Sequence, residues 1–177
     1  MSTSPMQDAF EHHVWASLRL IDACRELTPE QLDTKVPGTY GSILDTLRHF
    51  VTSDRGYLAL FTDGALPLIT DDEEATMSLD QLREVIVADG PAWQQLLAGN
   101  PDPEAELVRH RDDGTDSHAP IGLRLAQVIH HGTDHRSQVC TALTSLGIEP
   151  PEIDVWDYGR SDGRVFVTDA SGARLPD

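Results

Sequence analysis

The stretch HHGTDHR, residues 130–136, holds three of the chain's eight histidines and is the part of the sequence best suited to chemistry. If these residues form a helix, His131 and His135 stand at positions i and i+4, so their imidazole rings can converge on one point. Two imidazole nitrogens at that spacing are a recurrent first half of a zinc site. The alternative is an ordinary helical pair, in which each histidine bonds a backbone group or a carboxylate. The spacing alone leaves both interpretations open.

A helix over residues 121–146 is predicted to position these histidines. Its apolar stripe consists of Ile121, Leu125, Val128, Gly132, Val139, Leu143 and Leu146. At about 100° per residue, His135 lies on this stripe, His131 lies at its edge, and His130 points almost the opposite way, into solvent. No glutamate directly follows His131, so the metalloprotease pattern H-E-x-x-H, with a base beside the first ligand, is absent.

Three other long helices are predicted from apolar residues at helical spacing. The first covers residues 6–27, and Thr28 caps a short extra turn after it. The second begins after the cap Ser42 and ends near Gly64. The third begins at the capping box that starts with Ser78. Four amphipathic helices with little strand pattern predict an all-α fold of the helix-bundle type.

The connecting segments carry their own signals. Gly90-Pro91 lies within the third helix and predicts a kink or a break, because proline removes a backbone donor and clashes with the preceding turn. The acidic run at residues 71–74 is interpreted as a solvated surface, with a cation contact as the alternative. The Asp113-Gly114 turn predicts a small hairpin in a long irregular connection. The tail after Gly147 is too polar for a long helix, and its RVFVT run is interpreted as a strand or an extended arm.

Charge and cysteine content limit the range of functions. Thirteen basic residues against thirty acidic ones give a formal charge of −17, which repels nucleic-acid phosphates and anionic lipid. DNA, RNA and membrane partners are therefore not expected. The lack of a signal peptide or a long apolar run predicts a cytoplasmic protein of one domain. Cys24 and Cys140 are interpreted as reduced, buried thiols, with a disulfide between them as the alternative.

Two segments together resemble the DinB/YfiT-like superfamily of metal-binding four-helix bundles. The first is the pattern H-x-x-x-H-R-x-Q, which begins at His131 in the last long helix. The second is GSILDTLRHFVTSDRGYL, which is similar to the family's segment with one histidine midway along the second helix, and His49 takes that place. The order of apolar helix, acidic loop, Asp-Gly turn, H-x-x-x-H helix and Pro-rich exit also follows the family over residues 6–160.

This resemblance implies an up-down-down-up four-helix bundle over residues 1–163, with residues 164–177 as an extended or strand-forming tail. It also implies a metal site made by His49, His131 and His135, with zinc as the first choice and nickel or iron as alternatives. On the helical wheel His49 lies away from the apolar stripe of its own helix, so only the resemblance assigns it as a ligand. Family members commonly pair through their helices, which implies a homodimer.

Three neutral imidazoles on one metal ion leave at least one coordination position for water or substrate. Coordination lowers the pKa of a bound water or thiol. The resemblance therefore implies a metal-dependent transferase, isomerase or hydrolase, in which a low-molecular-weight thiol or a water attacks a small electrophilic substrate. The alternative is a non-catalytic metal-binding protein of the stress-response type.

Polar residues within five positions of these histidines are candidates for supporting roles. Asp45, Asp54 and Gln127 could each hydrogen-bond an imidazole or act as an acid or base, with a merely solvated side chain as the alternative. Arg136 is expected to form a structural ion pair with a neighbouring acid rather than to contact substrate.

The remaining aromatic residues and histidines are assigned by pattern alone. The candidates to line a pocket, with core packing as the alternative, are Tyr57, Trp156 and Tyr158. The histidines without a partner at ligand spacing are expected at the surface, and they are His12, His13, His110 and His118. The last two flank the Asp-Gly turn and would reach the site only if that loop folded over it.

Overall fold

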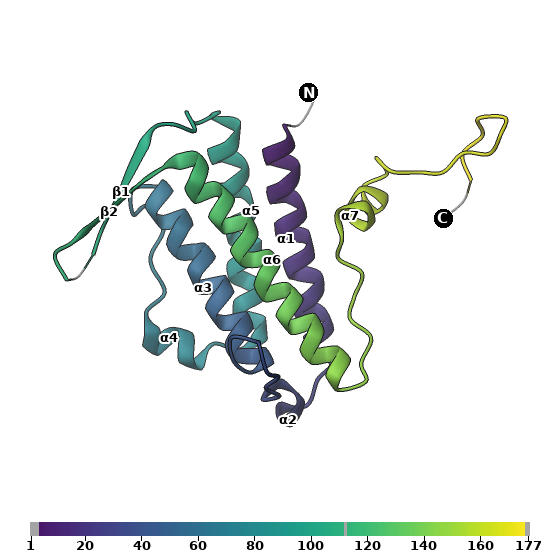
Figure 1. The fold of residues 1–177 in the computed structure, drawn as a ribbon, viewed down its shortest axis with the longest axis horizontal. Coiled ribbons are helices and arrows are strands. Elements are labelled where there is room, and N and C mark those ends of the chain that lie inside the picture. Colours follow the sequence, from purple (N-terminus) through teal and green to yellow (C-terminus); the bar gives the residue numbers. More distant parts are fainter. Residues whose placement is uncertain (1–3, 112, 176–177) are drawn as a thin grey trace.

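The computed structural model describes residues 4–111 and 113–175, and most of these residues are helical. The helices are α1 (Pro5–Cys24), α2 (Pro29–Leu32), α3 (Ile43–Phe61), α4 (Asp71–Thr76), α5 (Leu79–Ala98), α6 (Ile121–Ser145) and α7 (Val155–Ser161). The strands β1 (Glu106–His110) and β2 (Asp116–Pro120) pair in antiparallel fashion. Figure 1 shows the long helices α1, α3, α5 and α6 side by side, with the hairpin at one end.

Capping boxes explain where most of the helices begin. Ser4, Thr28, Ser42, Thr70 and Ser78 each accept a hydrogen bond from the backbone N–H three residues on, and that residue's side chain reaches back to the cap. Each box satisfies two backbone donors that a helix N-terminus leaves open. The boxes at Ser42 and Ser78 confirm the predicted starts. The box at Thr70 begins α4 within the acidic segment, which was predicted to be a loop.

A kink or a break was predicted at Gly90-Pro91, and helix α5 continues through both residues, so the break does not occur. A proline inside a helix costs about 3 kcal/mol or more. Trp93 and Leu97, which follow the proline, are buried, and large apolar side chains each contribute about 1.5–3 kcal/mol on burial. Packing of the second half of α5 therefore offsets the cost of the lost backbone hydrogen bond.

The last long helix and the hairpin follow the prediction. Helix α6 ends at Ser145, and Gly147 beyond it has a positive φ of 72°, which favours glycine over other residues. In the β1–β2 turn Gly114 has a φ of 80°, which confirms the turn glycine. None of the helices among the described residues is both long and apolar enough to cross a membrane.

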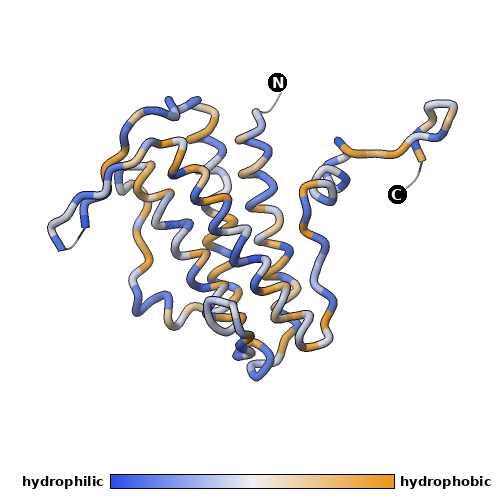
Figure 2. The backbone as a smooth tube through the Cα atoms, in the orientation of Figure 1, coloured by the Kyte–Doolittle hydropathy of each residue, from blue (hydrophilic) through white to orange (hydrophobic). Residues whose placement is uncertain are grey.

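The C-terminal segment contains one short helix that the sequence reasoning missed. Asp154 caps α7, whose seven residues fall within the tail that was predicted to lack a long helix. Beyond α7 the chain leads away from the long helices and carries a hydrophobic run (Figure 2). Phe166 and Val167 in this run are exposed, and the strand-like pairing in the described part of the tail is a bridge between Thr168 and Arg174.

Helix α3 is covered on two sides, since it packs against both α5 and α6, while α1 packs against the same two helices. This arrangement explains why His49 can face a neighbouring helix although it lies off the main apolar stripe of α3. Both cysteines are free thiols, as predicted, and Cys24 is buried as expected, whereas Cys140 is only half-buried. Burial raises the pKa of Cys24 to about 12, so this thiol is unreactive.

Two apolar clusters fill the interior and are separated by a layer of polar residues. One cluster includes Leu20, Phe50, Ile86 and Leu143, and the other includes Phe10, Leu58, Trp93 and Val128. On each long helix the residues between these clusters include buried polar groups, which we call the polar layer: His13, Asp54, Arg55, Asp89 and Arg136. Burying a charged group costs free energy unless the group is paired, so each member of this layer is expected to have a partner.

Candidate metal centre

Three imidazole rings converge where α3 lies against α6. His49 comes from α3, and His131 and His135 come from consecutive turns of α6. One ring nitrogen of each lies within 4.8 Å of the other two. The Nε2 atom of His131 is 3.3 Å from Nε2 of His49 and 3.2 Å from Nε2 of His135. The structure thus brings together the three residues that the resemblance implied.

These separations fit a single small cation. Zinc–nitrogen distances are about 2.0–2.1 Å, so two ligands of a tetrahedral zinc ion lie roughly 3.3 Å apart. His131 has this spacing to both of its neighbours. Three ring nitrogens this close together also form a donor set that suits zinc, nickel or iron. The residues present therefore fit the metal that the family resemblance implies.

The exposure of the histidines on α6 follows the helical wheel. His135 is buried, His131 is half-buried, and His130 is exposed to solvent, as predicted from their angular positions. His49 is half-buried on the side of α3 that faces α6.

Gln138 and Tyr40 hold two of the three rings in place. Nδ1–H of His135 donates to Oε1 of Gln138 at 3.2 Å, and the same oxygen accepts the backbone N–H of Tyr40 at 2.9 Å. The ring of Tyr40 stacks on His49 with centroids 4.0 Å apart. A proton on Nδ1 leaves Nε2 of His135 free to bind a metal. Gln138 is the glutamine of the H-x-x-x-H-R-x-Q pattern, whereas nothing in the sequence indicated Tyr40.

Burial favours the neutral form of two of the three candidate ligands. Desolvation lowers the pKa of His131 to about 4, and the charge of His135 acts in the same direction, while Asp54 opposes it. The pKa of His49 is also lowered, first by burial and then by His135. Both rings are consequently neutral at pH 7, and only neutral imidazole coordinates a metal.

The three candidates for supporting roles occupy different environments. Asp54 is buried, and its Oδ2 lies 2.6 Å from Nε2 of His13. Asp45 belongs to the capping box of α3, where its Oδ2 accepts the backbone N–H of Ser42 at 3.3 Å. Gln127 is exposed and faces a separate cavity of about 430 Å³ together with Tyr57. Of the three, Asp54 alone lies in the polar layer.

His13 was expected at the surface, and this expectation is wrong. Its side chain is in the core, with only 2% of the residue exposed, because Asp54 and Arg136 pair with its two ring nitrogens. Arg136 donates from Nη1 to Nδ1 of His13 at 3.0 Å and to Oγ of Ser17 at 3.1 Å. The expected direct ion pair of Arg136 with an acid is replaced by this chain through His13. These partners lie far apart in sequence, so no local pattern predicts them.

Gly132 makes room for this arrangement. A Cβ at this position would overlap the ring of His13, would lie 2.8 Å from its Nδ1, and would lie 3.0 Å from Nη1 of Arg136. Glycine at this position of α6 therefore allows α1 to approach closely, although glycine has a lower helix propensity than alanine. The glycine of HHGTDHR is thus explained by packing.

The other histidines lie apart from the centre. His12 is half-buried rather than at the surface, since its Nε2 bonds the carbonyl of Ile153 at 2.8 Å. His110 and His118 are exposed on the hairpin, as predicted. They pair with Asp116 at 2.7 Å and with Glu106 at 3.2 Å, respectively, across the two strands.

A polar cavity of about 770 Å³ opens beside His49. Tyr40 and Arg48 line it together with two acids of α4, Asp71 and Glu74. The acidic run is thus mostly exposed, as predicted, while Glu74 faces the region of His49 and raises the pKa of that ring against the effect of burial. The cavity provides room for a small molecule next to one candidate ligand.

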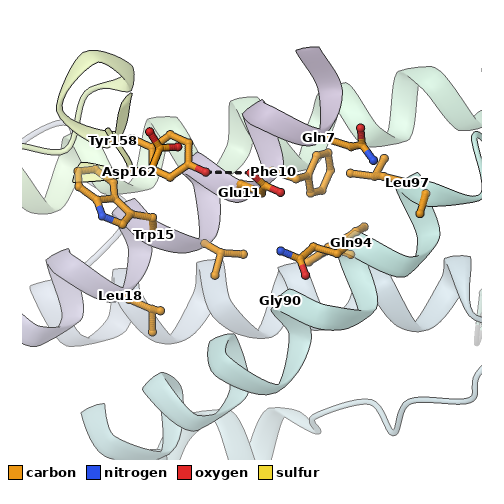
Figure 3. A pocket seen from close by; sticks show the side chains of 13 residues that line it. Gln7, Phe10, Glu11, Trp15, Leu18, Gly90, Gln94, Leu97, Tyr158 and Asp162 are labelled. Atoms are coloured by element: carbon orange, nitrogen blue, oxygen red, sulfur yellow. Dashed lines mark hydrogen bonds between the residues drawn. The ribbon is translucent and has the colours of Figure 1, made fainter. Parts of the chain in front are cut away.

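A more apolar cavity of about 750 Å³ lies between α1 and α5 (Figure 3). Trp15 and Phe10 line it, and Tyr158 of α7 stands at its rim, where its hydroxyl donates to Glu11 at 2.9 Å. The prediction that Tyr158 lines a pocket is therefore confirmed, as it is for Tyr57 in the smaller cavity. Trp156, by contrast, is 65% exposed, so it is not packed in the core.

Comparisons with known proteins relate the whole chain to one family. The chain matches the sequence model of the DinB family over residues 1–168. It is also similar to Protein DinB of Bacillus subtilis (strain 168), with 22% identity over 155 residues, which covers 84% of this chain and 90% of that protein.

Proposed function

Because this chain belongs to the DinB family, we propose that it is a metal-dependent enzyme with His49, His131 and His135 as the metal ligands. The observation that carries the proposal is the convergence of three Nε2 atoms at separations that suit one tetrahedral ion. Zinc is the metal we favour, and nickel or iron are the alternatives that metal analysis distinguishes.

A divalent metal held by three imidazoles would supply a nucleophile by lowering the pKa of a coordinated thiol or water. We propose that this nucleophile attacks a small electrophilic substrate in the polar cavity beside His49. The protein's own contribution is positional: Gln138 and Tyr40 hold the rings of His135 and His49, and burial lowers the pKa of His49 and His131, which favours their neutral forms. Lys35 and Arg48 line that cavity together with the acids Asp45, Asp71 and Glu74, so the cavity suits a polar substrate or thiol that carries charges of both signs.

We further assign the fold as an up-down-down-up four-helix bundle formed by residues 1–163, with residues 164–177 as a tail. The contacts of α1 and α3 with both α5 and α6 support this arrangement. A second copy of the chain is the proposed partner, and the exposed Phe166 and Val167 support an interface that includes the tail. Light scattering that finds only monomer at micromolar concentration would contradict the homodimer.

Cobalt substitution tests the proposed chemistry. Tetrahedral Co²⁺ in the centre should give visible absorption bands, and a low-molecular-weight thiol that binds the metal should add a sulfur-to-metal charge-transfer band. His131→Ala should lack these bands, whereas His130→Ala should retain them. Binding of cobalt without any response to a panel of thiols would rule out thiol activation and leave water activation, which ester and amide substrates then test. Lack of turnover in both panels would favour a non-catalytic metal-binding protein.

A further inference from the structure

Two buried polar atoms beside the metal centre lack a hydrogen-bond partner. Among the described residues, the buried side-chain nitrogens and oxygens without a partner are Asp54 Oδ1, His131 Nδ1 and Arg124 Nε. Arg124 lies against the hairpin, where its Nη2 donates to the carbonyls of Leu107 and Ser117. The other two come from α3 and α6, the helices that supply the metal ligands. Buried polar atoms are nearly always paired, so these two require an explanation.

The two atoms are chemically complementary once a metal is bound. Coordination through Nε2 places the remaining proton of His131 on Nδ1, which makes that atom a hydrogen-bond donor. Asp54 Oδ1 is an acceptor, and the charge of Asp54 already acts on the ring of His131. By comparison, the Nδ1 atom of the second α6 ligand, His135, has its acceptor in Gln138. The ring of His131 is therefore the one on α6 that still needs an orienting partner.

The other carboxylate oxygen of Asp54 is fixed by a chain of buried groups. Arg136 can only donate, so Nδ1 of His13 must accept its N–H, and the proton of a neutral His13 then lies on Nε2. That Nε2–H donates to Asp54 Oδ2 at 2.6 Å. The positive charge of Arg136 is thus linked to the negative charge of Asp54 through a neutral imidazole. This chain holds the carboxyl group of Asp54 in the core through one oxygen and leaves the other oxygen without a partner.

We propose that Asp54 is the positioning residue of the centre, with Oδ1 accepting the Nδ1–H of His131 while Oδ2 accepts the Nε2–H of His13. The inference rests on the metal centre proposed above. Metal-bound histidines usually donate their second N–H to a carboxylate, carbonyl or water, and loss of such a partner typically lowers metal affinity about 10–100-fold. Asp54 takes this part for His131, as Gln138 does for His135, and Arg136 and His13 keep Asp54 in place.

Asp54→Asn tests this role with little change of shape. The introduced amide has one acceptor, and His13 requires it because Arg136 fixes the proton of His13 on Nε2. The NH₂ group of that amide would then face His131 and force its proton onto Nε2, the atom that the metal needs. Zinc affinity, measured by chelator competition, should fall about 10–100-fold. Asp45→Asn is the matched control, since it replaces another α3 acid near His49 and should leave the affinity unchanged.

A spectroscopic readout separates positioning from a general structural effect. Its decisive measurement is made on the wild-type protein, and two variants serve as comparisons. In the zinc-loaded protein labelled with ¹⁵N-histidine, the Nδ1 proton of His131 should resonate at low field and exchange slowly with solvent, as expected for a buried N–H bonded to a carboxylate. This signal should survive in Asp45→Asn and disappear in Asp54→Asn. Absence of the signal in zinc-loaded wild type overturns the inference even if Asp54→Asn fails to fold.

The proposed metal centre and the role of Asp54 fail in different ways. If wild type and Asp45→Asn both bind no zinc, the metal centre itself is wrong, and the role of Asp54 falls with it. If both bind zinc tightly and a folded Asp54→Asn binds it equally well, the centre stands and the positioning role of Asp54 is refuted.

Discussion

The polar layer of the core has two halves, which differ in how completely their hydrogen bonds are satisfied. In the first half, Arg55 of α3 donates from Nε to both carboxylate oxygens of Asp89 at 2.9 and 3.0 Å, and both side chains are buried. In the second half, Arg136, His13 and Asp54 form a chain that ends in an oxygen without a partner. The closed pair joins two helices with no bonding capacity left over, whereas the open chain ends near His131, a proposed metal ligand. The comparison indicates that a buried polar group points to a functional site when one of its atoms lacks a hydrogen-bond partner.

Removal of one member of the closed pair should have the largest effect on stability. Asp89→Ala leaves the guanidinium of Arg55 buried without its partner, and breaking a buried ion pair in this way costs about 3–5 kcal/mol. The free energy of unfolding from urea denaturation should fall by that amount. Zinc affinity of the folded fraction should be unchanged, because the pair does not contact the ligand rings.

A double variant checks whether uncompensated charge is the cause of that loss. Arg55→Met combined with Asp89→Leu replaces the pair by apolar side chains of similar size, which is often neutral or stabilising. The double variant should therefore recover most of the stability that Asp89→Ala loses. A double variant as unstable as the single one would mean that the loss has another origin.

Gly132→Ala should disturb the open half through crowding. The added methyl group overlaps the ring of His13, and overpacking of a core typically costs about 1–3 kcal/mol. Gly56→Ala is the matched control, since a Cβ at that position of α3 meets no atom within 4 Å. The control should gain up to about 1 kcal/mol from helix propensity. A Gly132→Ala protein that is as stable as the control would contradict the close packing of α1 on α6.

The pH dependence of the metal-free protein should reflect the burial of His131. Its pKa is about 4 in the folded protein and near its ordinary value of 6.5 in the unfolded chain, so between these values the unfolded chain binds more protons. Stability should therefore fall as the pH is lowered from 7 to 5 in the presence of EDTA. The groups that act on His131 are His49, His135, Asp54 and Asp134, and the two acids oppose the shift. Urea denaturation that gives equal or greater stability at pH 5 would contradict this account.

Asp45→Ala should have the smallest effect. It removes the acid of the α3 capping box, and an acidic side chain in the first turn of a helix is worth about 0.3–1 kcal/mol. Zinc affinity should stay at the wild-type value, unlike that of Asp54→Asn. If Asp45→Ala weakened zinc binding as much as Asp54→Asn, the two acids could not be separated into a cap and a positioning residue.

The sequence predicted the parts that depend on local pattern. Apolar spacing and capping residues located the four long helices, and the i, i+4 rule with the helical wheel separated His131 and His135 from His130. The Thr70 capping box, T-x-x-E, could have revealed α4 in the same way. The break that was one of the two predicted outcomes at Pro91 does not occur, because tertiary packing, which local rules omit, stabilises the helix beyond it.

Residues whose roles depend on distant partners could not be predicted in this way. His13 lies 41 positions from Asp54 and 123 positions from Arg136, so its spacing gave no sign that it is buried. His49 was assigned only by resemblance, because its side of α3 becomes a buried face only when α6 packs against it. The long-range contacts, rather than the identities of the residues, turn these side chains into one site.

The most direct test of the account is the metal content of the protein purified without a histidine tag and equilibrated with zinc. Wild type and His130→Ala should each hold one zinc per chain after removal of excess metal, whereas His49→Ala, His131→Ala and His135→Ala should each hold much less. A wild-type protein without stoichiometric zinc, or ligand variants that retain as much as His130→Ala, would contradict the three-histidine centre.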